Sequence, residues 1–216
     1  MIITIGRQLG SGGREIGRRL AETRQFAFYD KELLEITANQ SGLSRKLFEQ
    51  TDERKYQDLP AGLFGMRFPF WGDNMVGYSG LNNEALFQIQ SDVIRSLAEQ
   101  QSCVFIGRCA DYILRDRNDC LNVFICANDD DRVRRIMEYK AEQSVSAEKA
   151  HEIMRQADKR RAAYYNYYTN KTWGLASSYH VCLNSSVLGI DGAVSLLSET
   201  ADKFETDTPQ NDNVIK

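Results

Sequence analysis

The sequence predicts an α/β fold in which a parallel β-sheet is covered by helices on both faces. Short apolar runs alternate with longer stretches of helical periodicity along most of the 216 residues. The runs at 103–107 and 120–126 are rich in β-branched and aromatic residues, which is typical of strands buried on both faces. The run at 2–6 leads into a glycine-rich segment and then into a helical stretch. Strands separated by helices of this length are expected to lie parallel in one sheet.

The elements follow from these patterns in chain order. We expect strands near 2–6, 26–29, 103–107, 120–126 and 179–184. Helices are expected near 13–24, 30–40, 44–55, 83–101, 109–116, 129–142, 146–167 and 190–204. Asn128 or Asp129 is expected to cap the helix that begins at Asp130. Residues 1–204 then form a single domain, with a helical lid region at 128–172 and a polar tail at 205–216.

Composition excludes several classes of protein. With 42% apolar and 26% charged residues, the chain has enough apolar side chains for a packed core, and its net charge of −3 does not favour binding to nucleic acid. No apolar run approaches the roughly 20 residues of a membrane span. Met1 leads directly into a strand, so we expect a cytoplasmic protein without a membrane partner. The five cysteines form no CxxC pair, which favours buried, reduced thiols over a zinc site. The oligomeric state does not follow from the sequence.

The glycine-rich segment after the first strand predicts a phosphate site. Gly10, Ser11, Gly12 and Gly13 lie between a strand and a helix, where backbone N–H groups and the helix dipole favour an anion. In the P-loop pattern GxxxxGK[ST], a lysine and a hydroxyl would occupy the positions of Gly13 and Arg14. Backbone cradling does not need those side chains, but the cation must come from elsewhere, and we expect Arg14 or Arg7 to supply it. A glycine-rich turn without a ligand is the alternative.

The strand at 103–107 ends in a second candidate segment. Gly107 turns the chain, Arg108 follows, and Asp111 lies at the start of the next helix. Both charges belong to the same sheet edge as the glycine loop. Arg108 suits an anionic phosphate, whereas Asp111 suits a ribose hydroxyl, a base amine or a metal ion. A surface arginine and a helix-start aspartate are the alternatives.

Arginines are frequent in the later helices, and phosphoryl transfer needs positive charge around the transferring group. Arg160 and Arg161 are interpreted as functional, whereas solvated or paired side chains are favoured for Arg132, Arg134, Arg135 and Arg155.

The tyrosines between 164 and 168 are interpreted mainly as core packing. Asp30 either caps the following helix or faces a substrate. The long aromatic and glycine-rich loop at 56–82 is expected to act as a lid or binding loop, or to pack its aromatic side chains on the core.

Taken in order, these segments resemble the cytidylate kinase-like family, a branch of the P-loop nucleoside monophosphate kinases. The resemblance runs through GRQLGSGGREIGRRLA, FAFYDKELL, VFIGRCADYIL, NVFICANDDDRVRRI, DKRRAAYYNYYTNKTWG and YHVCLNSSVLGIDGAV. It implies a P-loop NTPase fold, with three α/β/α layers, a five-stranded parallel sheet and a helical lid. It also implies transfer of the ATP γ-phosphoryl group to a cytidylate-like acceptor, with Mg²⁺.

The resemblance also carries over position by position. It assigns Gly10, Ser11, Gly12 and Gly13 to the donor phosphates, Gly107 and Arg108 to the monophosphate substrate, and Arg160 and Arg161 to the segment that closes over the phosphates. Asp30 falls at the substrate-side strand end. We add Arg7, Arg14 and Glu15 to the expected nucleotide-binding residues, and Lys31 and Asp111 to the expected substrate-binding residues. The chain departs from the family pattern in the missing lysine and in Cys109, where cytidylate kinases have an aspartate.

We therefore expect ATP-dependent phosphoryl transfer to a nucleoside monophosphate, most similar to CMP or dCMP. Arg14, Arg108, Arg160 and Arg161 are the expected catalytic residues. One alternative is a non-catalytic nucleotide-binding or phosphate-binding module, because the P-loop lysine and hydroxyl are missing. A second alternative is a kinase for a different small-molecule acceptor, whose pocket the 56–82 loop would shape. The sequence identifies no set of metal ligands.

Overall fold

A computed structural model describes residues 1–30, 83–141 and 144–207 of the chain. The strands are β1 (Ile2–Arg7), β2 (Ala27–Tyr29), β3 (Cys103–Ile106), β4 (Cys120–Cys126) and β5 (Val181–Asn184). The helices are α1 (Gly13–Arg24), α4 (Asn83–Gln100), α5 (Ala110–Ile113), α6 (Asp129–Tyr139), α7 (Ala147–Thr169) and α8 (Ser185–Asp207). The helices expected at 30–40 and 44–55, and the loop at 56–82, lie outside the described residues apart from Asp30.

All strands belong to one parallel sheet with the order β2-β3-β1-β4-β5. The central strand β1 pairs with β3 and β4, so that Ile5 lies beside Ile106 on one side and Val123 on the other. The sequence prediction of a five-stranded parallel sheet is therefore confirmed. The longer part of α8 begins after Gly189, whose φ of 69° interrupts the helix, in agreement with the helix expected at 190–204.

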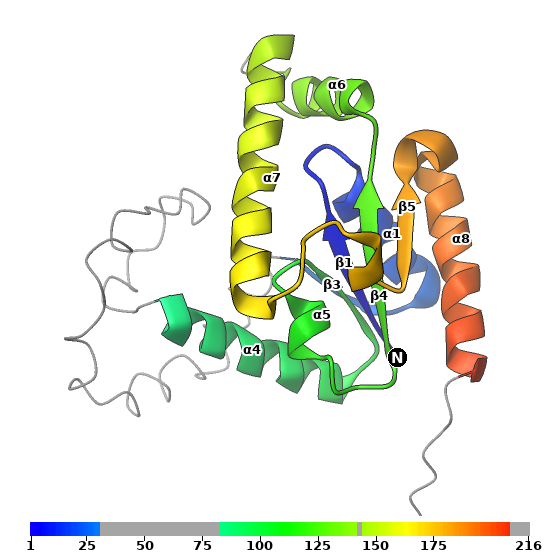
Figure 1. Ribbon diagram of the computed structural model, residues 1–216. Coiled ribbons are helices and arrows are strands. Elements are labelled where there is room, and N and C mark those ends of the chain that lie inside the picture. Colours follow the sequence, from blue (N-terminus) through cyan, green and yellow to red (C-terminus); the bar gives the residue numbers. More distant parts are fainter. Residues whose placement is uncertain (31–82, 142–143, 208–216) are drawn as a thin grey trace, which may run out of the picture.

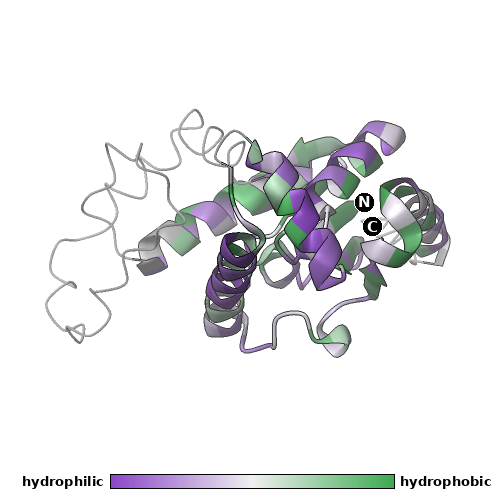
Figure 2. Cartoon of the chain, turned by 90° about the horizontal axis from the view of Figure 1, so that it is seen from above, coloured by the Kyte–Doolittle hydropathy of each residue, from purple (hydrophilic) through white to green (hydrophobic). Residues whose placement is uncertain are grey.

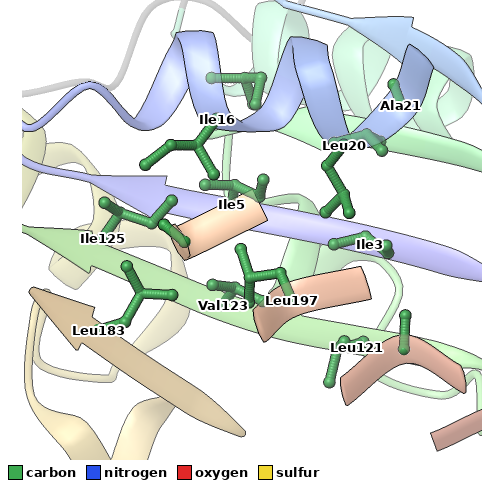
Figure 3. Packing of buried hydrophobic residues seen from close by; sticks show 14 residues of the cluster. Ile3, Ile5, Ile16, Leu20, Ala21, Leu121, Val123, Ile125, Leu183 and Leu197 are labelled. Atoms are coloured by element: carbon green, nitrogen blue, oxygen red, sulfur yellow. The ribbon is translucent and has the colours of Figure 1, made fainter. Parts of the chain in front are cut away.

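Helices cover both faces of the sheet (Figure 1). Alternate residues of β1 face opposite layers, because successive side chains of a strand point to opposite sides. Ile3 and Ile5 pack with residues of α1 and α8, including Leu20 and Leu197 (Figure 3). Ile2 packs on the other face with residues of α4 and α5. Figure 2 shows the hydrophobic colour on the strands inside the molecule and hydrophilic residues along the outer helices.

The carboxyl ends of β1 and β3 lie where the chain switches from one face of the sheet to the other. The helix after β1, α1, covers one face of the sheet, whereas the helix after β3, α5, covers the other. β1 and β3 are neighbours, and their chains leave in opposite directions at their carboxyl ends. A crevice at such a switch point is where α/β folds bind ligands. The glycine loop and the Gly107–Arg108 turn meet at this edge.

Several local expectations are refined by the structure. Asn128 is the N-cap of α6, but no side-chain hydrogen bond caps the helix. Its amide oxygen instead accepts a hydrogen bond of 3.0 Å from Asn184 on β5. All five cysteines are free thiols, and Cys103, Cys109 and Cys120 are buried as expected, whereas Cys182 is exposed. Within the described ranges, no helix is long and apolar enough to cross a membrane.

Candidate functional site

The glycine loop has the geometry of an anion cradle. Gly10 and Gly12 adopt φ values of 78° and 75°, a region that residues with a side chain rarely occupy. Gly12 is the N-cap of α1 and offers no side chain to cap the helix. The N–H groups that follow Gly13 in this turn keep the capacity to bind a ligand anion. Ser11 is buried, and its hydroxyl donates to Gln8 O at 2.9 Å and accepts from Gly13 N–H at 3.3 Å.

Three arginines of the predicted lid region hold the outside of this loop. Arg132 donates to Leu9 O at 2.8 Å, Arg135 to Gly10 O at 3.1 Å, and Arg161 to Arg7 O at 3.1 Å. Asp158 on α7 joins this arrangement, because it accepts from Leu9 N–H at 2.9 Å and pairs with Arg132. Each guanidinium therefore binds a backbone carbonyl at the end of β1 or in the loop. Arg132 and Arg135 thus support the loop backbone, and Arg134 pairs with Asp131 at the surface.

A cavity of about 100 Å³ opens beside the glycine loop, at the switch point between β1 and β3. Four arginines line it, which we call the arginine cluster: Arg7, Arg108, Arg160 and Arg161. Six aromatic residues, which we call the aromatic wall, also line it: Phe87, Tyr164, Tyr165, Tyr168, Trp173 and Tyr179. Asp111 is the one carboxylate among the lining residues that the structure describes. A lining that combines cations with aromatic rings suits a ligand that carries both an anionic group and a flat ring.

Arg7 is the member of the cluster closest to the glycine loop. Its stem lies against Gly13, so that a Cβ at position 13 would lie 2.6 Å from the Arg7 Cβ. Its guanidinium extends over Gly107, where a Cβ would lie 1.9 Å from Nη1. Within the described ranges, this guanidinium has no hydrogen bond or ion pair. Burial lowers the pKa of Arg7, and the charges of Arg161 and Arg108 lower it further.

Arg108 lies in a strained turn between β3 and α5. Gly107, Arg108 and Cys109 have consecutive φ values of 71°, 63° and 55°. The left-handed region is costly for residues with a side chain, and such strain gathers at functional sites. The turn is held by Gly107 N–H, which donates to Ile5 O at 3.0 Å, and by Gln90, whose amide donates to Arg108 O at 3.0 Å. This geometry brings the Arg108 side chain to the cavity.

Arg160 and Arg161 reach the same cavity from α7. The Nε atoms of both are buried without a hydrogen-bond partner among the described residues. Arg161 lies 3.6 Å from Asp158, whereas Arg160 has no ion pair in the part of the chain that the structure describes. Burial lowers the pKa of Arg161, although Asp158 opposes the shift. Guanidiniums gathered in this way repel one another, so an anion in the cavity would relieve the repulsion.

Asp111 lies in the first turn of α5 and is buried, with 7% of its surface exposed. Its carboxylate accepts a hydrogen bond of 2.6 Å from the Tyr165 hydroxyl on α7. Burial raises the pKa of Asp111, while the bond from Tyr165 and the charge of Lys171 act in the opposite direction. The bond links the turn that carries Arg108 to the helix that carries Arg160 and Arg161.

The remaining predicted residues lie elsewhere. Arg14 pairs with Asp30 at 2.6 Å, with the carboxylate buried and the arginine side chain 63% exposed, and neither lines the cavity. Glu15 pairs with Arg18 and Arg19 on the outer surface of α1. These positions leave the nucleotide-binding role of Arg14 and Glu15 as a prediction. Lys31 lies outside the described residues.

The side chains of the described residues do not fit a P-loop magnesium site. The position of the hydroxyl ligand is Arg14, which pairs with the carboxylate of Asp30. The Ser11 hydroxyl is buried and bonded to the loop backbone. No group of three metal-ligating side chains occurs among the described residues. We therefore assign no magnesium ligand and derive no reaction step through the ion.

Sequence reasoning missed several residues of the site, among them Gln90, Phe87 and Asp158. Gln90 and Phe87 lie on α4, whose sequence reads as an ordinary amphipathic helix, and Asp158 stands among the basic residues of α7. Nothing in their spacing indicates a function, because each contact joins positions far apart in the chain. The expected packing role of the tyrosines is correct for Tyr165, which is buried, whereas Tyr167 is 59% exposed. Tyr164 both packs and lines the cavity.

Comparisons with known proteins agree with the fold. The uncharacterized protein from Eubacterium ventriosum ATCC 27560 is 27% identical and superposes with a TM-score of 0.68, over 94% of this chain and 98% of that chain. Shikimate kinase from Bacteroides thetaiotaomicron is 15% identical with a TM-score of 0.52, over 94% and 98% of the two chains. The latter likeness shows the fold, which is that of the P-loop NTPases. No curated protein sequence matches significantly. The model of the cytidylate kinase-like family matches residues 2–187, and the chain belongs to that family.

Proposed function

We propose that this member of the cytidylate kinase-like family transfers the γ-phosphoryl group of ATP to a nucleoside monophosphate, with CMP or dCMP as the first acceptors to test. The observation that carries the proposal is the position of the arginine cluster. Four guanidiniums line a cavity at the carboxyl ends of β1 and β3, where the chain enters the glycine loop. Phosphoryl transfer depends on positioning and on charge stabilisation, and this arrangement offers both.

The donor phosphates would bind at the glycine loop. The first N–H groups of α1 and the loop backbone form the cradle, and the outer contacts of Arg132 and Arg135 keep the loop carbonyls turned away. Arg7 is better placed than Arg14 to replace the missing lysine. It lines the cavity and, within the described ranges, forms no direct ion pair, although the charge of Asp30 acts on it, whereas Arg14 pairs directly with Asp30.

The acceptor would bind in the cavity. Arg108 is suited to its phosphate, because a guanidinium can grip two oxygens at once, and the aromatic wall is suited to its base. An oxygen of the acceptor phosphate then attacks the γ-phosphorus, while the bond to the β,γ-bridging oxygen breaks and ADP leaves. Arg160 and Arg161 would stabilise the charge that spreads over the transferring group.

A phosphoryl-transfer assay with ATP, Mg²⁺ and a panel of nucleoside monophosphates tests this proposal. We expect diphosphate product with at least one pyrimidine monophosphate. In Arg108→Met, the acceptor KM should rise by about tenfold or more, because a charged hydrogen bond is lost, while the KM for ATP stays within twofold. Measurable ATP binding without product for any acceptor would instead support the non-catalytic nucleotide-binding module.

A second comparison decides which arginine serves the donor. Arg7→Met should lower kcat or ATP affinity by about tenfold or more. Arg14→Met should act mainly on stability, because it leaves the buried Asp30 carboxylate without this guanidinium. If Arg14→Met lowered activity or ATP affinity more than Arg7→Met, Arg14 would be the residue that replaces the lysine.

A further inference from the structure

The hydroxyl of Tyr164 lies at the junction of three elements that shape the cavity. Tyr164 is on α7 and lines the cavity together with Arg108 of the β3–α5 turn. The amide of Gln90 on α4 donates to the Tyr164 oxygen at 3.3 Å. The same amide donates to the carbonyl of Arg108 at 3.0 Å. Gln90 thus contacts both the strained turn and the tyrosine, and fixes their relative positions.

The Tyr164 oxygen accepts a hydrogen bond from Gln90, and the charge of Arg108 acts on it. Burial raises the pKa of Tyr164 to about 12, whereas the charge of Arg108 and the bond from Gln90 act in the opposite direction. The phenol proton has no acceptor among the described residues. With one lone pair occupied by the Gln90 amide, Tyr164 still has its proton to donate.

The ring of Tyr164 is held by its neighbours. It packs at 4.8 Å against Tyr168 and at 6.4 Å, edge to face, against Phe87. Phe87 and Tyr168 stack at 4.0 Å and nearly parallel, which ties α4 to α7 at this point. The ring therefore has little freedom to turn its hydroxyl toward another acceptor. The position that remains for the acceptor is the cavity beside Arg108.

We propose that Tyr164 is a second oxyanion donor beside Arg108, and that Gln90 is the positioning residue that directs the Tyr164 proton into the cavity. The ligand group is a phosphate or a similar tetrahedral oxyanion, because the adjacent donors are guanidiniums and the tyrosine presents a proton. The inference rests on the proposed function only in placing an anionic group at Arg108, and it holds for any acceptor that carries one.

Binding of inorganic phosphate, followed by ³¹P NMR titration of the full chain, tests this without a known acceptor. Arg108→Met identifies binding at this site. Tyr164→Phe removes one oxygen atom and should weaken phosphate binding by about tenfold. Gln90→Met should weaken it by a similar factor. On the Tyr164→Phe background, Gln90→Met should have a smaller effect than in the unaltered protein, and the effect that remains reports the lost bond to the Arg108 carbonyl.

Matched controls lie on the same two helices. Tyr167→Phe changes a tyrosine that is 59% exposed and outside the cavity, and Gln88→Met changes an exposed glutamine that contacts Asp92. Both should bind phosphate like the unaltered protein. If Gln90→Met fails to fold, Gln90→Glu keeps the length of the side chain, replaces the donor by an acceptor, and should also weaken binding.

Two results would overturn the inference. One is phosphate affinity in Tyr164→Phe equal to that of the unaltered protein, and the other is an undiminished effect of Gln90→Met on the Tyr164→Phe background. These outcomes are separate from the fate of the proposed function. Turnover of CMP with Tyr164-independent phosphate binding keeps the kinase and removes the inference. Tyr164-dependent phosphate binding without turnover of any monophosphate keeps the inference and removes the proposed acceptor class.

Discussion

The side chain of Arg7 occupies the space that a side chain at Gly13, the lysine position of the P-loop pattern, would need. A Cβ on Gly13 would lie 2.6 Å from the Arg7 Cβ, which is closer than two such atoms approach in proteins. The pattern GxxxxGK has glycine at the position of Arg7 and lysine at the position of Gly13. This chain has the reverse, a cation on the strand end and a glycine on the helix. The absence of the lysine and the presence of Arg7 are therefore linked, because the two side chains would compete for the same space.

Restoring the lysine alone should harm the protein. Gly13→Lys is expected to cost about 1–3 kcal/mol of unfolding free energy through overpacking against the Arg7 stem. Arg7→Gly combined with Gly13→Lys removes the clash and should recover most of that loss, measured by denaturant unfolding. Additive losses in the double variant would show that the two positions do not compete for the same space.

The contacts of Asp158 predict a large effect at a position with no sequence signal. Asp158→Ala leaves Arg132, which is 4% exposed, without its buried partner and Leu9 N–H without its acceptor. We expect a loss of about 3 kcal/mol or more. The matched control is Asp129→Ala, which removes the second carboxylate that pairs with Arg132. The Asp129 side chain is 65% exposed, so its loss should cost about 0.5 kcal/mol or less. Chemical denaturation of the two variants measures the difference, and equal losses would contradict the role of Asp158.

Asp111 predicts an unusual pH dependence of stability. Burial raises the folded-state pKa of its carboxyl, so its stabilising contribution is complete below the unfolded-state value and is lost as the pH rises through the folded-state pKa. Asp111→Asn mimics the neutral form and can still accept from Tyr165. The Tm of this variant relative to the unaltered protein should therefore increase from about pH 4 upward and then level off. A constant difference between the two melting curves across this range would exclude the effect.

Arg160 predicts opposite effects on stability and on ligand binding. Its Nε is buried without a partner among the described residues, and it adds a charge to the arginine cluster. Arg160→Met should raise the Tm by about 2 °C or more without ligand, because like charges are relieved. It should also reduce the Tm increase produced by phosphate. The control is Arg155→Met, an exposed position on the same helix, which should change neither value. A variant that is less stable and binds phosphate normally would assign Arg160 to packing.

The fold could be predicted largely from local patterns. The apolar runs at β1, β3 and β4 bury side chains on both faces, so their composition already indicates a parallel sheet between helix layers. The glycine loop and the Gly107–Arg108 turn follow strand ends, which fixes them to one edge of the sheet. These statements depend only on residues that are close in the sequence.

The identity of the loop cation depends on more than local sequence. In the sequence, Arg7 and Arg14 are equally good candidates to replace the missing lysine, since both flank the glycine loop. The tertiary structure separates them, because Asp30 pairs with Arg14 while Arg7 extends over Gly107. Asp30 lies at the end of β2 and Gly107 follows β3, so neither contact can be read from the loop itself.

The sequence by itself therefore determined the parallel α/β sheet and the position of the glycine loop at its edge, and it predicted that Arg108, Arg160 and Arg161 gather there. The tertiary structure alone decided that Arg132 and Arg135 hold loop carbonyls, that Asp158 joins them, and that Gln90 connects Arg108 to Tyr164. The physical reason is the range of the interactions. Periodicity and turn chemistry act within a few residues, whereas hydrogen bonds to a guanidinium or an amide join whichever helices the sheet order brings together.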